Sequence, residues 1–352
     1  ACTWEEVPMK QFKKLLAPLF SILVALLLGT ALIWACGYEP FRAYSALLKG
    51  AFGSVRYALA TLEKSVPMIL CGLAAVVAMK SGIFNIGAEG QLYIGALAYT
   101  AAALYLDFLP GVIHLAVCLA AAIAGGALWA LIPAVMKVRL RINEVVTSIM
   151  LNYTAKLLIA FLVSGPMKAP GDVSQSEAIP ASAAIGEIAA GGKITWGFML
   201  AIVLCVVVWV IFRHTSFGYD ITAAGMNDRA AAAGGIRPDQ VRLQAMLISG
   251  GLAGLAGGLL VASAFGRVVI AVSTGYGFDG ISIAVLGLYS PVGVFLSSVL
   301  FGALRTGSLY MEMFVHIPSE LIDVLQGIII VVIASPALFQ MLIRRREKSH
   351  DK

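Results

Sequence analysis

The sequence predicts an all-α membrane protein of about ten transmembrane helices, because its composition is strongly apolar and its apolar runs are long. Of its 352 residues, 60% are hydrophobic and only 12% are charged. A soluble domain carries about 25% charged residues. So little charge, together with a mean hydropathy of +0.91, is typical of a chain whose surface faces lipid.

Apolar runs recur along the whole chain, most of them long enough to cross a bilayer core of roughly 30 Å. They predict spans near 15–37, 59–80, 88–106, 112–135, 144–163, 194–212, 243–262, 277–290, 291–310 and 319–340. The first run lacks the small-residue cleavage site of a signal peptide, so we expect it to be a span. Residues 1–352 are therefore predicted to form one membrane domain, with a first half at 15–163 and a second half at 194–340.

The distribution of Lys and Arg predicts how these spans are oriented. With the N-terminus inside, most of the 25 basic residues fall in the inner segments. The outer segments then hold only Arg42, Lys49, Arg56, Lys168, Lys193 and Arg267. This asymmetry follows the positive-inside rule, and ten spans would place both termini in the cytoplasm. Because the positive charges lie between apolar runs, they indicate membrane orientation rather than nucleic-acid binding.

The longest loop expected on the inner side runs from residue 213 to residue 242. Ala230–Ala233 favours a helix, and the following Gly234-Gly235 favours its end. We expect a short helix here, lying under the membrane.

Two of the predicted spans are shorter than the others. The second is purely apolar only over 66–79, since Glu63 and Lys64 interrupt it, and it leads into the polar, Gly-rich stretch 81–91. The eighth span is also short, and it opens with Gly-Tyr-Gly-Phe-Asp-Gly at 275–280.

These two elements occupy similar places in two halves that run in opposite directions through the membrane. Short or Gly-broken segments in inverted halves indicate a substrate pathway, because lipid cannot satisfy the freed backbone groups whereas a watery cavity can. A charge near the bilayer centre costs about 2.5–3.5 kcal/mol, so Glu89 and Asp279, which adjoin these elements, are candidate functional residues. The alternative is that both elements are ordinary turns at the membrane interface.

Motifs for enzymatic chemistry are nearly absent. The chain has no G-x-x-x-x-G-K-[ST] phosphate loop, no H-E-x-x-H and no G-x-S-x-G. Residues 275–280 match G-x-G-x-x-G, but no strand is predicted before them. The four His and five Cys residues show no metal-ligand spacing. We predict a protein that is not an enzyme and that has no metal and no cofactor of its own.

Three stretches, 82–91, 223–236 and 277–293, together resemble the membrane permease subunits of ATP-binding-cassette (ABC) importers. The resemblance is to the group that handles branched-chain amino acids, simple sugars and nucleosides, and it covers roughly residues 60 to 335. The form Asn-Ile-Gly-Ala-Glu-Gly-Gln at 85–91 and the stretch 141–153 are most similar to nucleoside-type permeases. Arg229 departs from the pattern that other members often carry.

The resemblance implies the ABC importer permease fold and a location in the plasma membrane of a prokaryote. It also implies a second permease subunit (a relative or a second copy), cytoplasmic ATPase subunits that bind the ATP, and an extracytoplasmic solute-binding protein. The loop 213–242 would be the coupling loop on which the ATPase docks. The expected coupling residues are Thr222, Ala223, Gly225, Asn227, Asp228 and Ala231.

The substrate implied by the resemblance is a nucleoside. Stacking and hydrogen bonds to such a molecule would come from Phe84, Asn85, Glu89, Gln91, Phe278 and Asp279. Other ring compounds, simple sugars and vitamins stay open as substrates. An ion-coupled secondary transporter that works without an ATPase is the alternative function, and an integral-membrane enzyme is a third.

Overall fold

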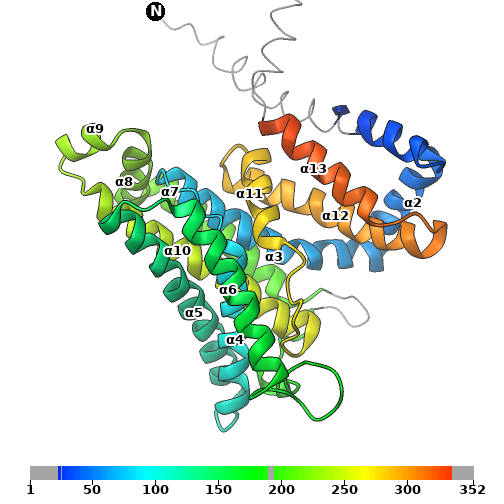
Figure 1. Ribbon diagram of the computed structural model, residues 1–352, viewed down its shortest axis with the longest axis horizontal. Helices are drawn as coiled ribbons and strands as arrows, with labels where there is room; N and C mark the ends of the chain where they lie inside the picture. Colours follow the sequence, from blue (N-terminus) through cyan, green and yellow to red (C-terminus); the bar gives the residue numbers. More distant parts are fainter. Residues whose placement is uncertain (1–22, 25, 189–193, 335–352) are drawn as a thin grey trace, which may run out of the picture. The chain divides into compact units, whose positions relative to one another are not determined.

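The computed structural model describes residues 23–24, 26–188 and 194–334 (Figure 1). Over these residues the secondary structure is helical, and the extended pairing consists of two isolated bridges, Gln175 with Val269 and Glu187 with Thr195. The predicted all-α class is therefore confirmed for the part of the chain that is described.

Among the described residues, six helices are long and apolar enough to cross a membrane. They are α3 (Val55–Lys80), α5 (Gly111–Leu140), α6 (Glu144–Ser164), α7 (Trp196–His214), α10 (Pro238–Leu259, continued by the π-helical turn η2, Leu260–Phe265) and α12 (Pro291–Val315). The remaining elements are a helix at Leu26–Ala35, α2 (Pro40–Phe52), α4 (Ala88–Tyr105), η1 (Ala181–Ala183), α8 (Ser216–Met226), α9 (Asp228–Ala233), α11 (Tyr276–Leu286) and α13 (Glu320–Ala334). The protein is thus a multi-pass membrane protein.

Every predicted span overlaps a helix. Parts of the first and last predicted spans, 15–37 and 319–340, lie outside the described residues. The total of about ten spans and the two inverted halves stay predictions.

The chain divides into two compact units. The first consists of residues 1–61 and 303–352, and the second of residues 62–302. In the first unit, Ile33, Leu47 and Met311 are buried in one apolar cluster. Beside that cluster, the ring of Tyr310 stacks on Phe314 with a centroid distance of 4.3 Å.

The core of the second unit is the packing of α4, α5 and α10 (Figure 1). A Cβ atom on Gly95 of α4 would lie 2.3 Å from the Cα of Gly254 on α10, and one on Gly126 of α5 would lie 2.6 Å from the same atom. Only glycine fits such an approach, which maximises van der Waals contact between helices in lipid. Gly250, Gly254 and Gly258 recur every four residues along α10, and this spacing therefore serves helix packing.

The second predicted span is not interrupted at Glu63 and Lys64, since α3 is one helix of 26 residues. Both oxygens of the Glu63 carboxylate accept hydrogen bonds of 2.8 Å from Thr195, one from its backbone N–H and one from its hydroxyl. Thr195 is the N-cap of α7, so the negative charge lies at the positive end of that helix. The carboxylate is stabilised by this partner and does not break the helix that carries it.

Candidate functional site

The two short elements singled out in the sequence are in direct contact. The backbone N–H of Gly277 donates a 2.7 Å hydrogen bond to Oε2 of Glu89. A Cβ atom on Gly277 would lie 2.3 Å from the backbone nitrogen of Glu89, so the two main chains touch. Residues separated by 188 positions in the sequence thus form one junction.

Glu89 lies at two helix N-termini at once. It is in the first turn of α4, and its carboxylate accepts from the first turn of α11. Both helix dipoles stabilise negative charge at this position, which compensates for the burial of a side chain that is only 7% exposed. Asp279 lies in the same first turn of α11, so a second carboxyl group occupies this junction.

The loop that precedes α11 is held by Ser273. Its hydroxyl oxygen accepts hydrogen bonds of 3.2 Å from the backbone N–H groups of Gly275 and Tyr276. The hydroxyl of Tyr93 on α4 donates to the carbonyl oxygen of Ser273 at 3.1 Å. Gly275 has φ +99°, a conformation that glycine adopts without a steric penalty. These contacts aim the N-terminus of α11 at α4.

A cavity of about 530 Å³ opens beside this junction, and we name it the Glu89 cavity. Three aromatic residues line it, together with a glutamate, a lysine, an asparagine, a serine and a threonine. Its lining residues are Ile86, Glu89, Tyr93, Ile149, Asn152, Tyr153, Lys156, Ser273, Thr274, Gly275 and Phe278. A cavity of this size with few, convergent polar groups is typical of a site for a small molecule.

Of the predicted pathway residues, Glu89 and Phe278 line this cavity. The pathway residues predicted from the sequence did not include those of α6, which supplies Asn152, Tyr153 and Lys156. A usable indication was present, because Lys156 is a charged residue inside an apolar span, and such residues face a partner or water.

Asn152 joins α6 to the element that carries Glu89. Its Oδ1 accepts a 2.8 Å hydrogen bond from the N–H of Gly90, and its Nδ2 donates to the carbonyl oxygen of Ile86 at 3.0 Å. The side chain is 7% exposed, so both bonds are shielded from solvent. Asn152 therefore fixes one wall of the cavity against another.

Asn85 and Gln91 line neither of the two cavities described here. The two amides exchange hydrogen bonds of 2.9 and 3.1 Å, and Nδ2 of Asn85 also donates to the hydroxyl of Ser249 at 2.8 Å. That hydroxyl donates to the carbonyl oxygen of Ala74 at 2.7 Å. The buried pair thus holds its own segment to α10 and α3, and a contact of either residue with substrate stays a prediction.

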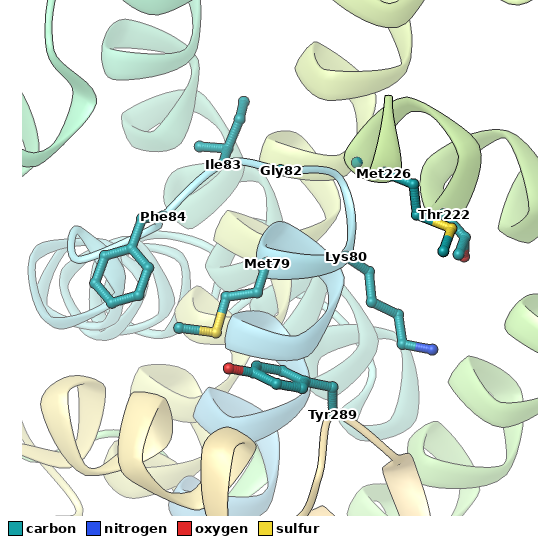
Figure 2. Close-up of a pocket in the computed structure, with 9 residues that line it drawn as sticks. Met79, Lys80, Gly82, Ile83, Phe84, Thr222, Met226 and Tyr289 are labelled. Atoms are coloured by element: carbon teal, nitrogen blue, oxygen red, sulfur yellow. The ribbon is translucent and has the colours of Figure 1, made fainter. Parts of the chain in front are cut away.

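Phe84 faces a second cavity, of about 520 Å³, which we name the Phe84 cavity (Figure 2). Figure 2 shows Met79 and Lys80 at the end of α3, Tyr289 on the chain after α11, and Thr222 and Met226 on α8. The residues that line the Phe84 cavity are Met79, Lys80, Gly82, Ile83, Phe84, Thr222, Gly225, Met226 and Tyr289. One predicted pathway residue and two predicted coupling residues, Thr222 and Gly225, therefore surround one space.

The predicted coupling segment forms two helices, α8 and α9, of which α9 is the short helix expected over 230–233. The helices are separated by Asn227, whose backbone is extended, with φ −159° and ψ 113°. Its side-chain oxygen accepts from the N–H groups of Arg229 and Ala230 and so caps α9. The short helix predicted over 230–233, with its end at Gly234, is therefore confirmed as α9. The preceding helix α8 was not predicted, and Asn227 separates the two because it ends α8 and caps α9.

The six predicted coupling residues lie on or between these two helices. Thr222, Ala223 and Gly225 are on α8, Asn227 is the linker, and Asp228 and Ala231 are on α9. Ala231 is buried, whereas Asn227 and Asp228 are exposed.

The end of α8 touches the turn that follows α3. A Cβ atom on Gly225 would lie 2.0 Å from the carbonyl oxygen of Lys80 and 3.0 Å from the nitrogen of Gly82. Gly82 has φ +80°, so this turn also needs glycine for its backbone conformation. The turn leads directly to Phe84, which places the coupling segment next to the Phe84 cavity.

Six helices that are long and apolar enough to cross a membrane, and two cavities lined in part by polar residues, are the features of a multi-pass membrane transport protein. The chain belongs to the family described as "Branched-chain amino acid transport system / permease component", which matches residues 57–334. It is a permease of the ABC transporter class, as the sequence resemblance predicted.

Three curated relatives cover nearly the whole chain. A guanosine ABC transporter permease of Bacillus subtilis, NupP, is 34% identical over 97% of this chain and 99% of its own. A glucose ABC transporter permease of Haloferax volcanii, TsgB13, is 34% identical over 92% of this chain and 88% of its own. A nucleoside ABC transporter permease of Lactococcus lactis, NupB, is 31% identical over 94% of this chain and 93% of its own.

Proposed function

We propose that this chain forms the substrate pathway of an ATP-driven importer and that its substrate is a nucleoside. The observation that carries the proposal is the lining of the Glu89 cavity, where Tyr93, Tyr153 and Phe278 lie with a carboxylate and an ammonium group. A volume of about 530 Å³ is within the range of small-molecule sites, roughly 300–1,000 Å³. Two of the three relatives described above are named for guanosine or nucleoside transport.

The chemistry of the cavity suits a purine nucleoside. Aromatic side chains stack on nucleobases, with about 1–3 kcal/mol lost per base when such a ring is truncated to alanine. Guanine presents acceptors at O6 and N7 and donors at its amino group. Lys156 supplies a donor and Glu89 an acceptor on two different walls of the cavity, α6 and α4. Hydroxyls at Ser273 and Thr274 are of the kind that ribose hydroxyls bind.

Glucose is the second candidate, because TsgB13 is as similar to this chain in percentage identity as NupP is. The two candidates differ in what they ask of Tyr153 and Phe278. A nucleobase would stack its flat face on these rings, whereas a sugar would present mostly hydroxyls for hydrogen bonding. The three aromatic residues of the cavity suit a nucleobase, and the names of NupP and NupB support the nucleoside.

The energy for transport would come from an ATPase subunit that docks on α8 and α9, with a second permease chain completing the pathway. An extracytoplasmic solute-binding protein would deliver the substrate. In this arrangement α8 and α9 face the cytoplasm, and the chain lies in the plasma membrane of a prokaryote with both termini inside. The family assignment supports the ATP-driven class over an ion-coupled secondary transporter.

The test is uptake by the complete complex, reconstituted in liposomes with its ATPase and its binding protein. We expect ATP-dependent uptake of radiolabelled guanosine that vanadate blocks and that a hundredfold excess of glucose leaves unchanged. If glucose inhibits this uptake and other nucleosides do not, the substrate is a sugar and not a nucleoside. Uptake by the permease alone that follows a proton or sodium gradient and resists vanadate would overturn the ATP-driven mechanism.

A further inference from the structure

One side chain, Arg242 on α10, joins the coupling segment to the turn after α3. Its guanidinium donates two hydrogen bonds to the carboxylate of Asp228 on α9, of 2.9 Å from Nη1 and 2.6 Å from Nη2. Its Nε donates to the carbonyl oxygen of Ser81 at 3.3 Å. A single cation therefore binds both segments, which lie 147 residues apart in sequence (228 minus 81).

The guanidinium is well shielded for a group that binds an exposed partner. The Arg242 side chain is 15% exposed, while that of Asp228 is 51% exposed. A Cβ atom on Gly82 would lie 3.4 Å from Nη2 of Arg242 and 3.3 Å from the Cα of Gly225. The guanidinium of Arg242 thus lies within the tight contact between α8 and the turn, and its N–H donors are held in one orientation.

The turn is fastened to α10 at a second point as well. Asn85 binds the hydroxyl of Ser249, which lies seven residues after Arg242 on the same helix, about 10 Å along the axis. Residues 81 to 85 are therefore attached to α10 at both ends, and Ile83 and Phe84 between these attachments line the Phe84 cavity. A displacement of α9 that pulls on Arg242 would act on one end of this short segment.

We propose that Arg242 is a positioning residue that transmits movement of α8 and α9 to the Phe84 cavity through the turn at Ser81-Gly82. The proposal builds on the function proposed above, in which an ATPase moves these two helices. The two hydrogen bonds to Asp228 fix the orientation of the guanidinium as well as its distance from the carboxylate. At the same time, the Nε–H donates to the carbonyl oxygen in the turn. Lysine, with one compact ammonium group, cannot make the three bonds together.

The first test measures guanosine imported per ATP hydrolysed by the full complex in liposomes. We expect Asp228→Ala, Arg242→Ala and Arg242→Lys each to lower this ratio by on the order of fivefold or more, a typical size for coupling between sites. The double variant Asp228→Ala/Arg242→Ala should lose no more than either single variant, since both remove one link. Losses that multiply in the double variant, or single variants with the normal ratio, would overturn the proposal.

A matched control comes from another ion pair of α10. Arg141 and Asp239 approach to 3.9 Å, and their side chains are 77% and 49% exposed. The pair is a surface contact of the kind that contributes little, about 0–1 kcal/mol. Arg141→Ala and Asp239→Ala should leave the ratio unchanged; a loss equal to that of the Arg242 variants would mean that any charge removal near α10 uncouples the complex.

The second test needs no transport, so it separates failure of this proposal from failure of the proposed function. Nitroxide labels would be placed at Ala232→Cys on α9 and Leu140→Cys on α5, both exposed positions, after Cys2 and Cys36 are replaced by Ser. Pulsed electron resonance in the purified permease should give a narrow distance distribution that Asp228→Ala and Arg242→Ala broaden. Unchanged distributions would overturn the proposal even if the wild-type complex imports guanosine.

Discussion

The carboxylate of Glu89 accepts a 2.7 Å hydrogen bond from the backbone N–H of Gly277, and this bond joins the first turns of α4 and α11. The same side chain lines the cavity of about 530 Å³ that we propose as the substrate site. One residue thus has two tasks, to hold two helices together and to present a charged acceptor. Substitutions that separate these tasks are the most informative.

Glu89→Gln keeps an acceptor for the Gly277 N–H but removes the charge. Hydrogen bonds to charged groups contribute about 1 kcal/mol more than neutral ones, so we expect guanosine uptake to fall roughly fivefold while the protein stays folded. Glu89→Ala also leaves a buried N–H without its acceptor, which costs about 1–3 kcal/mol, so the melting temperature should fall as well. Thermal unfolding in detergent, followed by fluorescence, together with uptake in liposomes, distinguishes the two. Equal behaviour of both variants would contradict the double task.

Gly277→Ala tests the contact between the two main chains. The added Cβ would lie 2.3 Å from the nitrogen and 2.5 Å from the Cα of Glu89, and neither backbone atom can rotate away. Overpacking of this kind costs about 1–3 kcal/mol, so the melting temperature of the permease should drop. Gly186→Ala is the control, since nothing lies within 4 Å of its Cβ and it has no positive φ. Similar melting temperatures for the two variants would show that α4 and α11 separate easily.

Tyr153→Ala tests base stacking in the Glu89 cavity. If the ring stacks on a nucleobase, its removal should weaken guanosine binding by about 1–3 kcal/mol, which is roughly 5- to 150-fold in apparent affinity. Tyr153→Phe keeps the ring and should transport almost normally. Tyr105→Ala is the control, because Tyr105 is similarly exposed (69% against 64%) and does not line the cavity. A loss in Tyr153→Phe as large as that in Tyr153→Ala would assign the hydroxyl, rather than the ring, to binding.

Gly225→Ala tests the contact between α8 and the turn after α3. The new Cβ would lie 2.0 Å from the carbonyl oxygen of Lys80, so α8 must move away from the turn. We expect less guanosine imported per ATP hydrolysed, by on the order of fivefold, in a complex that still assembles. Gly234→Ala, whose Cβ would meet its nearest neighbour at 3.4 Å, changes the same segment without a clash and should keep normal coupling. Normal coupling in both variants would exclude this contact from the transmission route.

The helical class, the approximate positions of the long apolar helices and the family could be predicted from the sequence alone, whereas α2 and α8 were not predicted. Apolar runs give helix positions because a backbone in lipid must satisfy its hydrogen bonds within the segment. Charge and glycine patterns also picked out the two elements that meet at Glu89 and Gly277, because polar groups and breaks in apolar runs are costly unless they have partners.

Which polar side chains line a cavity could not be predicted from the sequence, because it depends on the tertiary fold. Asn85, Glu89 and Gln91 lie within seven residues of one another, yet Glu89 lines a cavity, whereas Asn85 and Gln91 bind each other and Asn85 also binds Ser249. How each helical turn is rotated, and which segments pack against it, determine which side chains line a cavity. Neither can be read from a single sequence. Arg242 and Asp228 likewise are ordinary loop and helix charges until the fold brings α9, α10 and the Ser81 turn together. The physical reason is that burial and hydrogen bonding depend on segments far apart in the chain, whereas helix formation in lipid depends mainly on the segment itself.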